Sequence, residues 1–204
     1  MTTIKFIFLS IVFYSCGQNN VKQKADPSVT ILSNKVIPLT NYLDNLDSCK
    51  KALLYLDSAT TIDSNCFSCY YNKLIFLSSL NQYEKAVLTI NNCIRIKPYA
   101  HDLYLKGGIF LEKISDTVSS KKYFQKSLTI CNSVLDTMNI NNADYEMLMI
   151  NKAVNLIMLG DQKKGNEIFK KMYDQETEPD LKKLTLKFMN KNKKQLLDSM
   201  IIDQ

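Results

Sequence analysis

A pattern of small and large residues recurs every 34 positions along the chain. Within residues 70–98, apolar residues recur at helical spacing in two runs, which predicts two amphipathic helices joined by a turn at Leu80-Asn81-Gln82. Pro98 ends the second run because proline cannot extend a helix. Positions 34 residues apart hold small, large, small and large side chains in turn: Ala52, Ala86 and Ser120; Leu56, Ile90 and Phe124; Ala59, Cys93 and Ser127; Ile62, Ile96 and Ile130. Such hairpins must stack to bury their apolar faces.

A fourth copy of the unit follows late. Gly165 lies 45 rather than 34 residues after Ser120, and Phe169 and Met172 continue the pattern. An insertion is therefore expected around residues 131–142, where an Asn-rich stretch predicts turns.

The pattern resembles the tetratricopeptide repeat (TPR) over residues 38–174. The residues that carry the resemblance are Tyr70, Leu80, Tyr83, Ala86, Ile90, Cys93 and Pro98 in one unit, and Tyr104, Gly107, Gly108, Leu111, Ile114, Ser120, Phe124 and Ser127 in the next. It implies an all-α, right-handed superhelical array of about four TPR-like helix–turn–helix repeats with C-terminal capping helices. We expect the repeat domain over residues 36–176 and the capping helices over residues 177–204.

Local signals place the helix ends. Asp47-Ser48 is predicted to cap the second helix of the first unit, and Asp116 that of the third. Pro179, preceded by Thr177-Glu178, predicts the start of a capping helix. The side chains expected to point inward in the first unit are Leu39, Leu43, Leu46, Leu53, Leu56 and Ile62.

The N-terminus predicts export. Lys5 precedes a short apolar run over residues 6–13, which is too short to span a bilayer because spanning needs about 20 apolar residues. The following Phe13-Tyr14-Ser15-Cys16 resembles a bacterial lipoprotein lipobox. The resemblance implies a signal peptide over residues 1–15 and acylation of Cys16 at its sulfur and new amino group. An ordinary secretion signal and a retained anchor are the alternatives.

Residues 16–35 are polar, so they are expected to form a lipidated Cys followed by a flexible tether. The expected location is the cell envelope, with the chain on the periplasm-facing side of the outer membrane.

The remaining cysteines favour structure over chemistry. Cys93 falls at a small core position, and Cys49 and Cys131 are unassigned. Cys66 and Cys69 form a CxxC at a helix start, where thiolate chemistry is conceivable. Structural thiols or a structural disulfide are the simpler interpretation, and a thiol-redox module is the alternative. Tyr70 follows Cys69, so the CxxCH pattern of haem attachment does not fit, and with one histidine and no second CxxC a zinc site does not fit either.

His101 is predicted to be a surface residue, and no catalytic motif accompanies it. We therefore expect that the chain is not an enzyme and that it holds no cofactor or metal. The formal net charge of +6 is too mild to indicate nucleic-acid binding. A basic cluster in the capping segment is predicted to be a solvated face, with contact to anionic lipid or an acidic partner as the alternative: Lys182, Lys183, Lys187, Lys191, Lys193 and Lys194.

The resemblance also implies a binding surface. In the family, the first helices of successive units line a concave face that holds a peptide or a partner helix. By position, this face would comprise Tyr71, Asn72, Ile75, Leu105, Lys106, Ile109, Ile150, Asn151 and Val154. We therefore expect a lipid-anchored scaffold that binds another protein through an apolar groove. A constitutive structural subunit of an outer-membrane assembly is the remaining alternative, and the tether or the terminal helices could cover part of the face.

Overall fold

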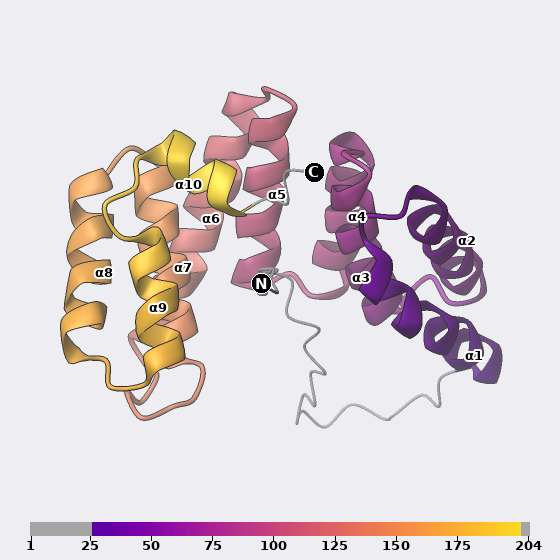
Figure 1. Cartoon of the computed structure of the whole chain (residues 1–204), viewed down its shortest axis with the longest axis horizontal. Helices are drawn as coiled ribbons and strands as arrows, with labels where there is room; N and C mark the ends of the chain where they lie inside the picture. Colours follow the sequence, from indigo (N-terminus) through magenta and orange to yellow (C-terminus); the bar gives the residue numbers. More distant parts are fainter. Residues whose placement is uncertain (1–25, 201–204) are drawn as a thin grey trace. The chain divides into compact units, whose positions relative to one another are not determined.

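A computed structural model of the chain describes residues 26–200, and all regular secondary structure in this range is helical. These residues belong to two compact units, the first ending at Ile96 and the second beginning at Lys97 (Figure 1). None of the helices described is long and apolar enough to cross a membrane. The signal peptide and Cys16 lie outside the described residues, so their predicted roles stay predictions.

In the first unit, each α-helix packs against the next one along the chain. Pro38 has no N–H and its ring clashes with the preceding helical turn, which accounts for the change from α-helix to 3₁₀ helix at this point. α1, η1 and α2 together form the first hairpin, and α3 and α4 form the second. The elements are α1 (Pro27–Val36), η1 (Ile37–Tyr42), α2 (Leu46–Ile62), α3 (Phe67–Ser79) and α4 (Tyr83–Ile96).

In the second unit, two further hairpins are followed by two shorter helices. α5 packs on α6, α6 on α7 and α7 on α8, while α9 packs against α8 and α10 against α7 (Figure 1). The elements are α5 (His101–Lys113), α6 (Thr117–Leu135), α7 (Tyr145–Met158), α8 (Gln162–Gln175), α9 (Pro179–Phe188) and α10 (Lys193–Met200). The predicted helical repeat array with helices after the last repeat is therefore present.

The 34-residue register is confirmed by burial. The first three positions of the register are fully buried in each of three hairpins: Ala52, Ala86 and Ser120; Leu56, Ile90 and Phe124; Ala59, Cys93 and Ser127. The small residues allow helices to approach closely, and two glycines show how closely. A Cβ atom at Gly108 would lie 2.5 Å from the ring of Phe124, and one at Gly165 would lie 2.7 Å from the carbonyl oxygen of Ala153.

The turns inside the hairpins are built alike. Asn81, Ser115 and Gly160 each have a positive φ, of 54°, 63° and 98°. Their spacing of 34 and then 45 residues follows the repeat and its insertion. In each turn, the N–H of the following residue donates to the carbonyl five positions back, as in Gln82 to Leu77 and Asp116 to Leu111. This is the Schellman arrangement, which satisfies the carbonyls left free at a helix end. Asp116 then caps α6 through Ser119 N–H, as predicted.

The insertion lengthens one helix and one loop. α6 has 19 residues against 14 in α4, and residues 136–144 form a turn-rich connection to α7. The insertion predicted around residues 131–142 is thus confirmed.

Three predictions for the first unit are wrong. α1 begins at Pro27, capped by Asp26, so the tether predicted for residues 16–35 extends too far. The short helix forms because Val29 and Val36 bury their side chains against α2 and α3. Asn45, rather than Asp47-Ser48, caps α2 by accepting from Ser48 N–H. Leu46 and Ile62, at the two ends of α2, are 51% and 48% exposed and do not point inward.

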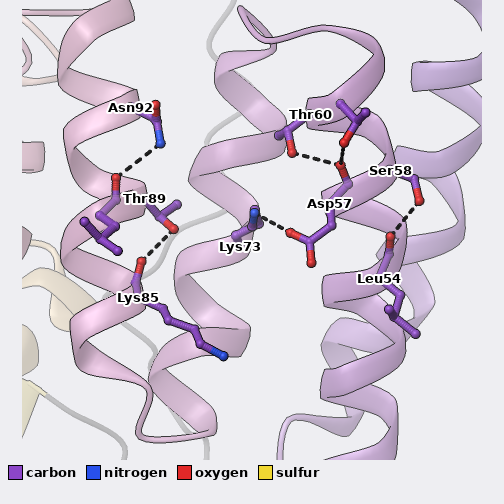
Figure 2. A network of polar contacts seen from close by, with 10 residues as sticks. Leu54, Asp57, Ser58, Thr60, Lys73, Lys85, Thr89 and Asn92 are labelled. Carbon is purple, nitrogen blue, oxygen red and sulfur yellow. Dashed lines mark hydrogen bonds and ion pairs between the residues drawn. The ribbon is translucent and has the colours of Figure 1, made fainter.

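Polar contacts also hold the first unit together. Figure 2 shows Lys73 of α3 reaching Asp57 of α2, with 2.5 Å between Nζ and Oδ1. The Lys73 side chain is 15% exposed and that of Asp57 is 59% exposed, so the ion pair lies at the edge of the packed surface and is partly screened by solvent. The other bonds drawn, such as Thr89 to Lys85 and Asn92 to Leu88, stay within one helix. The ion pair therefore joins neighbouring hairpins.

Candidate protein-binding surface

Most of the predicted concave-face residues are packed inside the fold. Tyr71, Asn72 and Ile75 belong to the first unit and the other six to the second. Tyr71, Asn72 and Lys106 are half-buried, and Lys106 forms an ion pair with Asp102 on its own helix. These three stay predicted partner contacts. The buried members are Ile75, Leu105, Ile109, Ile150, Asn151 and Val154.

The prediction that these six residues line an open apolar groove is therefore wrong. Ile75 belongs to a core cluster with Val29 and Val36 of α1, so the first unit itself covers it. In the second unit, α10 packs against α7, the helix that carries Ile150 and Val154. A charge placed at such a position would disrupt the core rather than block a partner.

His101 is half-buried and hydrogen-bonded, so its prediction as a surface residue is wrong. Its ring Nδ1 lies 3.3 Å from Asn151 Nδ2, and its carbonyl accepts from the hydroxyl of Ser127. Asn155 donates both to that hydroxyl and to the carbonyl of Asn151. The Ser127 hydroxyl thus bonds to the His101 backbone rather than to its ring, and the cluster joins α5, α6 and α7 without forming a nucleophile–base pair.

Burial lowers the pKa of His101, and the nearby Asp102 carboxylate opposes this only in part. The unfolded chain therefore binds a proton more readily than the folded chain. We expect the free energy of unfolding to fall as the pH drops below about 6.5, the ordinary histidine pKa. Urea unfolding between pH 7.5 and 5 should show the loss, and His101→Gln should reduce it. An unchanged pH profile in this variant would contradict the prediction. Burial raises the pKa of Glu146, so this residue makes the folded chain more stable as the pH falls, opposite to the effect of His101. Glu146 is present in both the native chain and His101→Gln, so the comparison between them isolates His101.

The cysteine pair at the start of α3 is joined in a disulfide between Cys66 and Cys69. Cys66 is the N-cap of α3, and Cys69 is fully buried beside the Ser33 hydroxyl. The pair is thus present as a disulfide, one of the forms that the sequence left open. Cys49, Cys93 and Cys131 form no disulfide within residues 26–200, and all three are fully buried. The predicted core position of Cys93 is confirmed.

Native thiol reactivity should be very low. Burial raises the pKa of Cys49, and it raises that of Cys131 to about 12, so neither forms much thiolate near neutral pH. We expect iodoacetamide to label Cys49, Cys93 and Cys131 rapidly in denaturant and hardly at all in the folded chain. Mass spectrometry of the labelled peptides measures this. Rapid labelling of Cys131 in the folded chain would contradict its placement in the core.

The basic cluster of the capping segment is partly engaged by its own fold. Lys182 lies over the ring of Tyr173 at 4.7 Å. Lys193 forms a 2.7 Å ion pair with Glu112, whose side chain is 9% exposed and also accepts from Ser120. Within residues 26–200, no group of three His, Cys, Asp or Glu side chains is placed to hold a metal ion.

A groove of about 1100 Å³ lies within the second unit, against α6 and the turn between α7 and α8. Its apolar lining comes from Val118 of α6 and from Ile157, Met158 and Leu159 at the end of α7. Its charged lining comes from Lys121, Lys122 and Lys126 of α6, together with the Glu112–Lys193 pair. We call this the α6 groove.

Sequence analysis missed the α6 groove, although one sign of it was available. α6 carries three lysines and no acidic residue over 19 positions. Such a helix presents an unbalanced positive face, which differs from a solvated helix with charges of both signs. The apolar part could not be foreseen, because it depends on how α7 ends beside α6.

The sequence matches no protein-family model and no curated protein. Among solved structures, the fold resembles MamA from Desulfovibrio magneticus RS-1, from residue 41 to its end, with a TM-score of 0.52 and 18% sequence identity. The match covers 76% of this chain and 80% of that one. MamA is a TPR-containing protein, so the likeness supports a TPR-like fold. At this identity it supports the fold alone.

Proposed function

We propose that this chain is a scaffold for protein–protein interaction, held at a bacterial membrane by acylated Cys16. The observation that carries the proposal is the stack of TPR-like hairpins, whose equivalent positions are buried alike from one hairpin to the next. Repeats of this kind bury each hairpin on its neighbours and leave long helical surfaces for partners. The TPR-like neighbour supports the same kind of function at the level of fold.

The anchor would place these surfaces close to the membrane. α1 is capped by Asp26, so the tether between Cys16 and the first hairpin is at most residues 16–25. Ten residues reach about 35 Å when fully extended. A triacylated cysteine would make release from the bilayer negligible, because each buried methylene contributes about 0.8 kcal/mol. The proposed location is the periplasm-facing side of the outer membrane.

Two measurements test the proposal. Labelled palmitate should be incorporated into the native chain and not into Cys16→Ala. Brief crosslinking of membranes, followed by detergent extraction and pull-down, should capture a defined envelope protein with the native chain. A lack of palmitate incorporation would overturn the anchor, and a lack of any captured partner would overturn the scaffold. A partner that stays bound at fixed stoichiometry without crosslinking would instead favour a constitutive subunit of an envelope assembly.

The Cys66–Cys69 disulfide gives a second candidate function, thiol–disulfide exchange. Cys66 lies at the N-terminus of α3, where the helix dipole favours a thiolate once the bond is reduced. The full burial of Cys69 favours a structural role instead. With dithiothreitol as the reductant, the native chain should speed insulin reduction and Cys66→Ser should not if the pair takes part in exchange, whereas a rate no higher than that with dithiothreitol alone would end this candidate function.

A further inference from the structure

We propose that the α6 groove binds an acidic segment of a partner protein that also carries apolar side chains. The inference rests on the proposed scaffold function and assigns it a surface. This surface differs from the concave-face residues, because it lies on the second helix of a hairpin and against the turn of the next.

The apolar part of the groove is open to an incoming side chain. Val118 is 69% exposed at the first turn of α6, although valine is usually buried. Of the other apolar residues that line the groove, Ile157 and Met158 are buried and Leu159 is half-buried, so they belong to the packed end of α7. An apolar side chain of a partner that covers Val118 would remove its own surface and that of Val118 from water, and this burial is favourable.

The lysines that line the groove on α6 are not paired with acidic residues of the same lining. Lys121, Lys122 and Lys126 are exposed, and none of the ion pairs formed within residues 26–200 includes them. The one acidic residue of the lining, Glu112, is already neutralised by Lys193.

Two further carboxylates lie next to the groove in sequence, and both are engaged. Asp116 accepts from Ser119 N–H, and this bond together with nearby Lys122 lowers the pKa of its carboxyl, so Asp116 offsets part of the Lys122 charge. Asp161 caps α8 and pairs with Lys164 at 2.7 Å, which leaves Lys121 and Lys126 without a neighbouring carboxylate from either residue. The field over the groove is therefore positive and suits carboxylates of a partner.

A second hollow continues the same pattern along α6. It has about 380 Å³ and is lined by Leu128, Leu156 and Ile168, with Lys152 and Lys171 among the charged residues and Glu167 as the one acid. The residues of the larger groove run from Thr117 to Thr129 of α6, which is about 18 Å at 1.5 Å per residue. An extended segment of about six residues would cover this length.

The lining favours a polypeptide over other anions. No aromatic side chain lines the groove, so nucleic-acid bases have nothing to stack on. All its cations are lysines, which lack the bidentate fork that arginine offers to phosphate. A hollow with apolar walls also fits side chains better than it fits the flat surface of a membrane. Carboxylates alternating with apolar groups meet both parts of the lining.

The probe for the test is a fluorescein-labelled twelve-residue peptide in which Asp and Glu alternate with Leu and Phe. Fluorescence anisotropy with the purified full chain should show saturable binding that weakens with added salt. A peptide with Lys in place of the acids, and one with Ser in place of the apolar residues, should each bind at least tenfold more weakly. Equal binding of the three peptides would overturn the proposal.

Variants locate the binding. The double substitution Lys121→Glu with Lys126→Glu should weaken the acidic probe at least tenfold, and Val118→Ser should weaken it severalfold. The matched control is Lys50→Glu with Lys51→Glu on α2, which changes the net charge equally at exposed lysines of the other unit and should change affinity less than twofold. Circular dichroism should show that all these variants are folded. If both double variants lost the same affinity for the acidic peptide, the loss would come from the change in net charge alone, and the α6 groove would not be the binding site.

Binding to vesicles of phosphatidylglycerol tests whether the groove binds an anionic membrane surface instead of an acidic peptide. If they bind in a way that depends on Lys121 and Lys126 while the acidic peptide does not bind, the occupant is a membrane surface and the proposal falls. If the membrane pull-down captures a partner equally well with the Lys121→Glu and Lys126→Glu chain, the scaffold function stands and the α6 groove is not its site. If the peptide binds as expected but no partner is captured, the scaffold function fails and the groove stands.

Discussion

Replacing Phe124 by alanine should lower the free energy of unfolding by about 3–5 kcal/mol. Phe124 is fully buried in α6, and its ring fills the space beside Gly108 of α5. Removing the ring leaves a cavity that the helices cannot close, because the Gly108 contact already brings α5 and α6 near each other. Urea unfolding followed by circular dichroism measures the loss.

A graded series makes the cause clear. Phe124→Leu keeps much of the volume and should cost less than the alanine variant. Val118→Ala on the same helix removes an exposed side chain and should change stability by less than about 0.5 kcal/mol. A Phe124→Ala variant as stable as Val118→Ala would mean that the repeat register is misplaced.

Replacing Ile75 by aspartate should destabilise the fold by at least about 3 kcal/mol, because it buries an unpaired charge. Ile75 is 6% exposed and lies in the core cluster of the first unit. An open binding groove would predict the opposite, namely a folded variant that has lost only its partner. Thermal unfolding, compared with the unaltered chain, separates the two.

Leu88→Asp is the matched control for this substitution. It makes the same kind of change on α4 of the same unit, at a side chain that is 65% exposed, and should be nearly neutral. If Ile75→Asp were as stable as Leu88→Asp, the concave-face residues would again be candidates for partner contact.

The hairpins could be predicted because their information is local. The small residues at Ala86 and Ser120, and the turn positions at Asn81 and Gly160, recur at a spacing that only stacked helical hairpins require. The insertion also showed in the register, since it shifts every later position equally. The start of α1 was not predicted, because the polar run before Pro27 was extended through a segment that also holds Val29 and Val36, and this short helix packs its apolar side chains against α2.

The binding surface was harder to predict because exposure is not local. Family position indicates that Ile150 and Val154 lie on a first helix, yet it says nothing of a terminal helix packing against that helix. Leu196 of α10 is fully buried, and α10 packs against α7. In the same way, His101 gains its hydrogen bonds from α6 and α7, which are distant in sequence.

The sequence by itself determined the helical period, the place of the hairpin turns and the small residues at the helix contacts. These depend on backbone conformation and on side-chain size at a fixed spacing. Only the tertiary structure decided which apolar side chains stay in contact with water. It buried Ile75 and Val154 and left Val118 exposed beside three lysines, because burial depends on which helices meet, and that is a property of the packed fold.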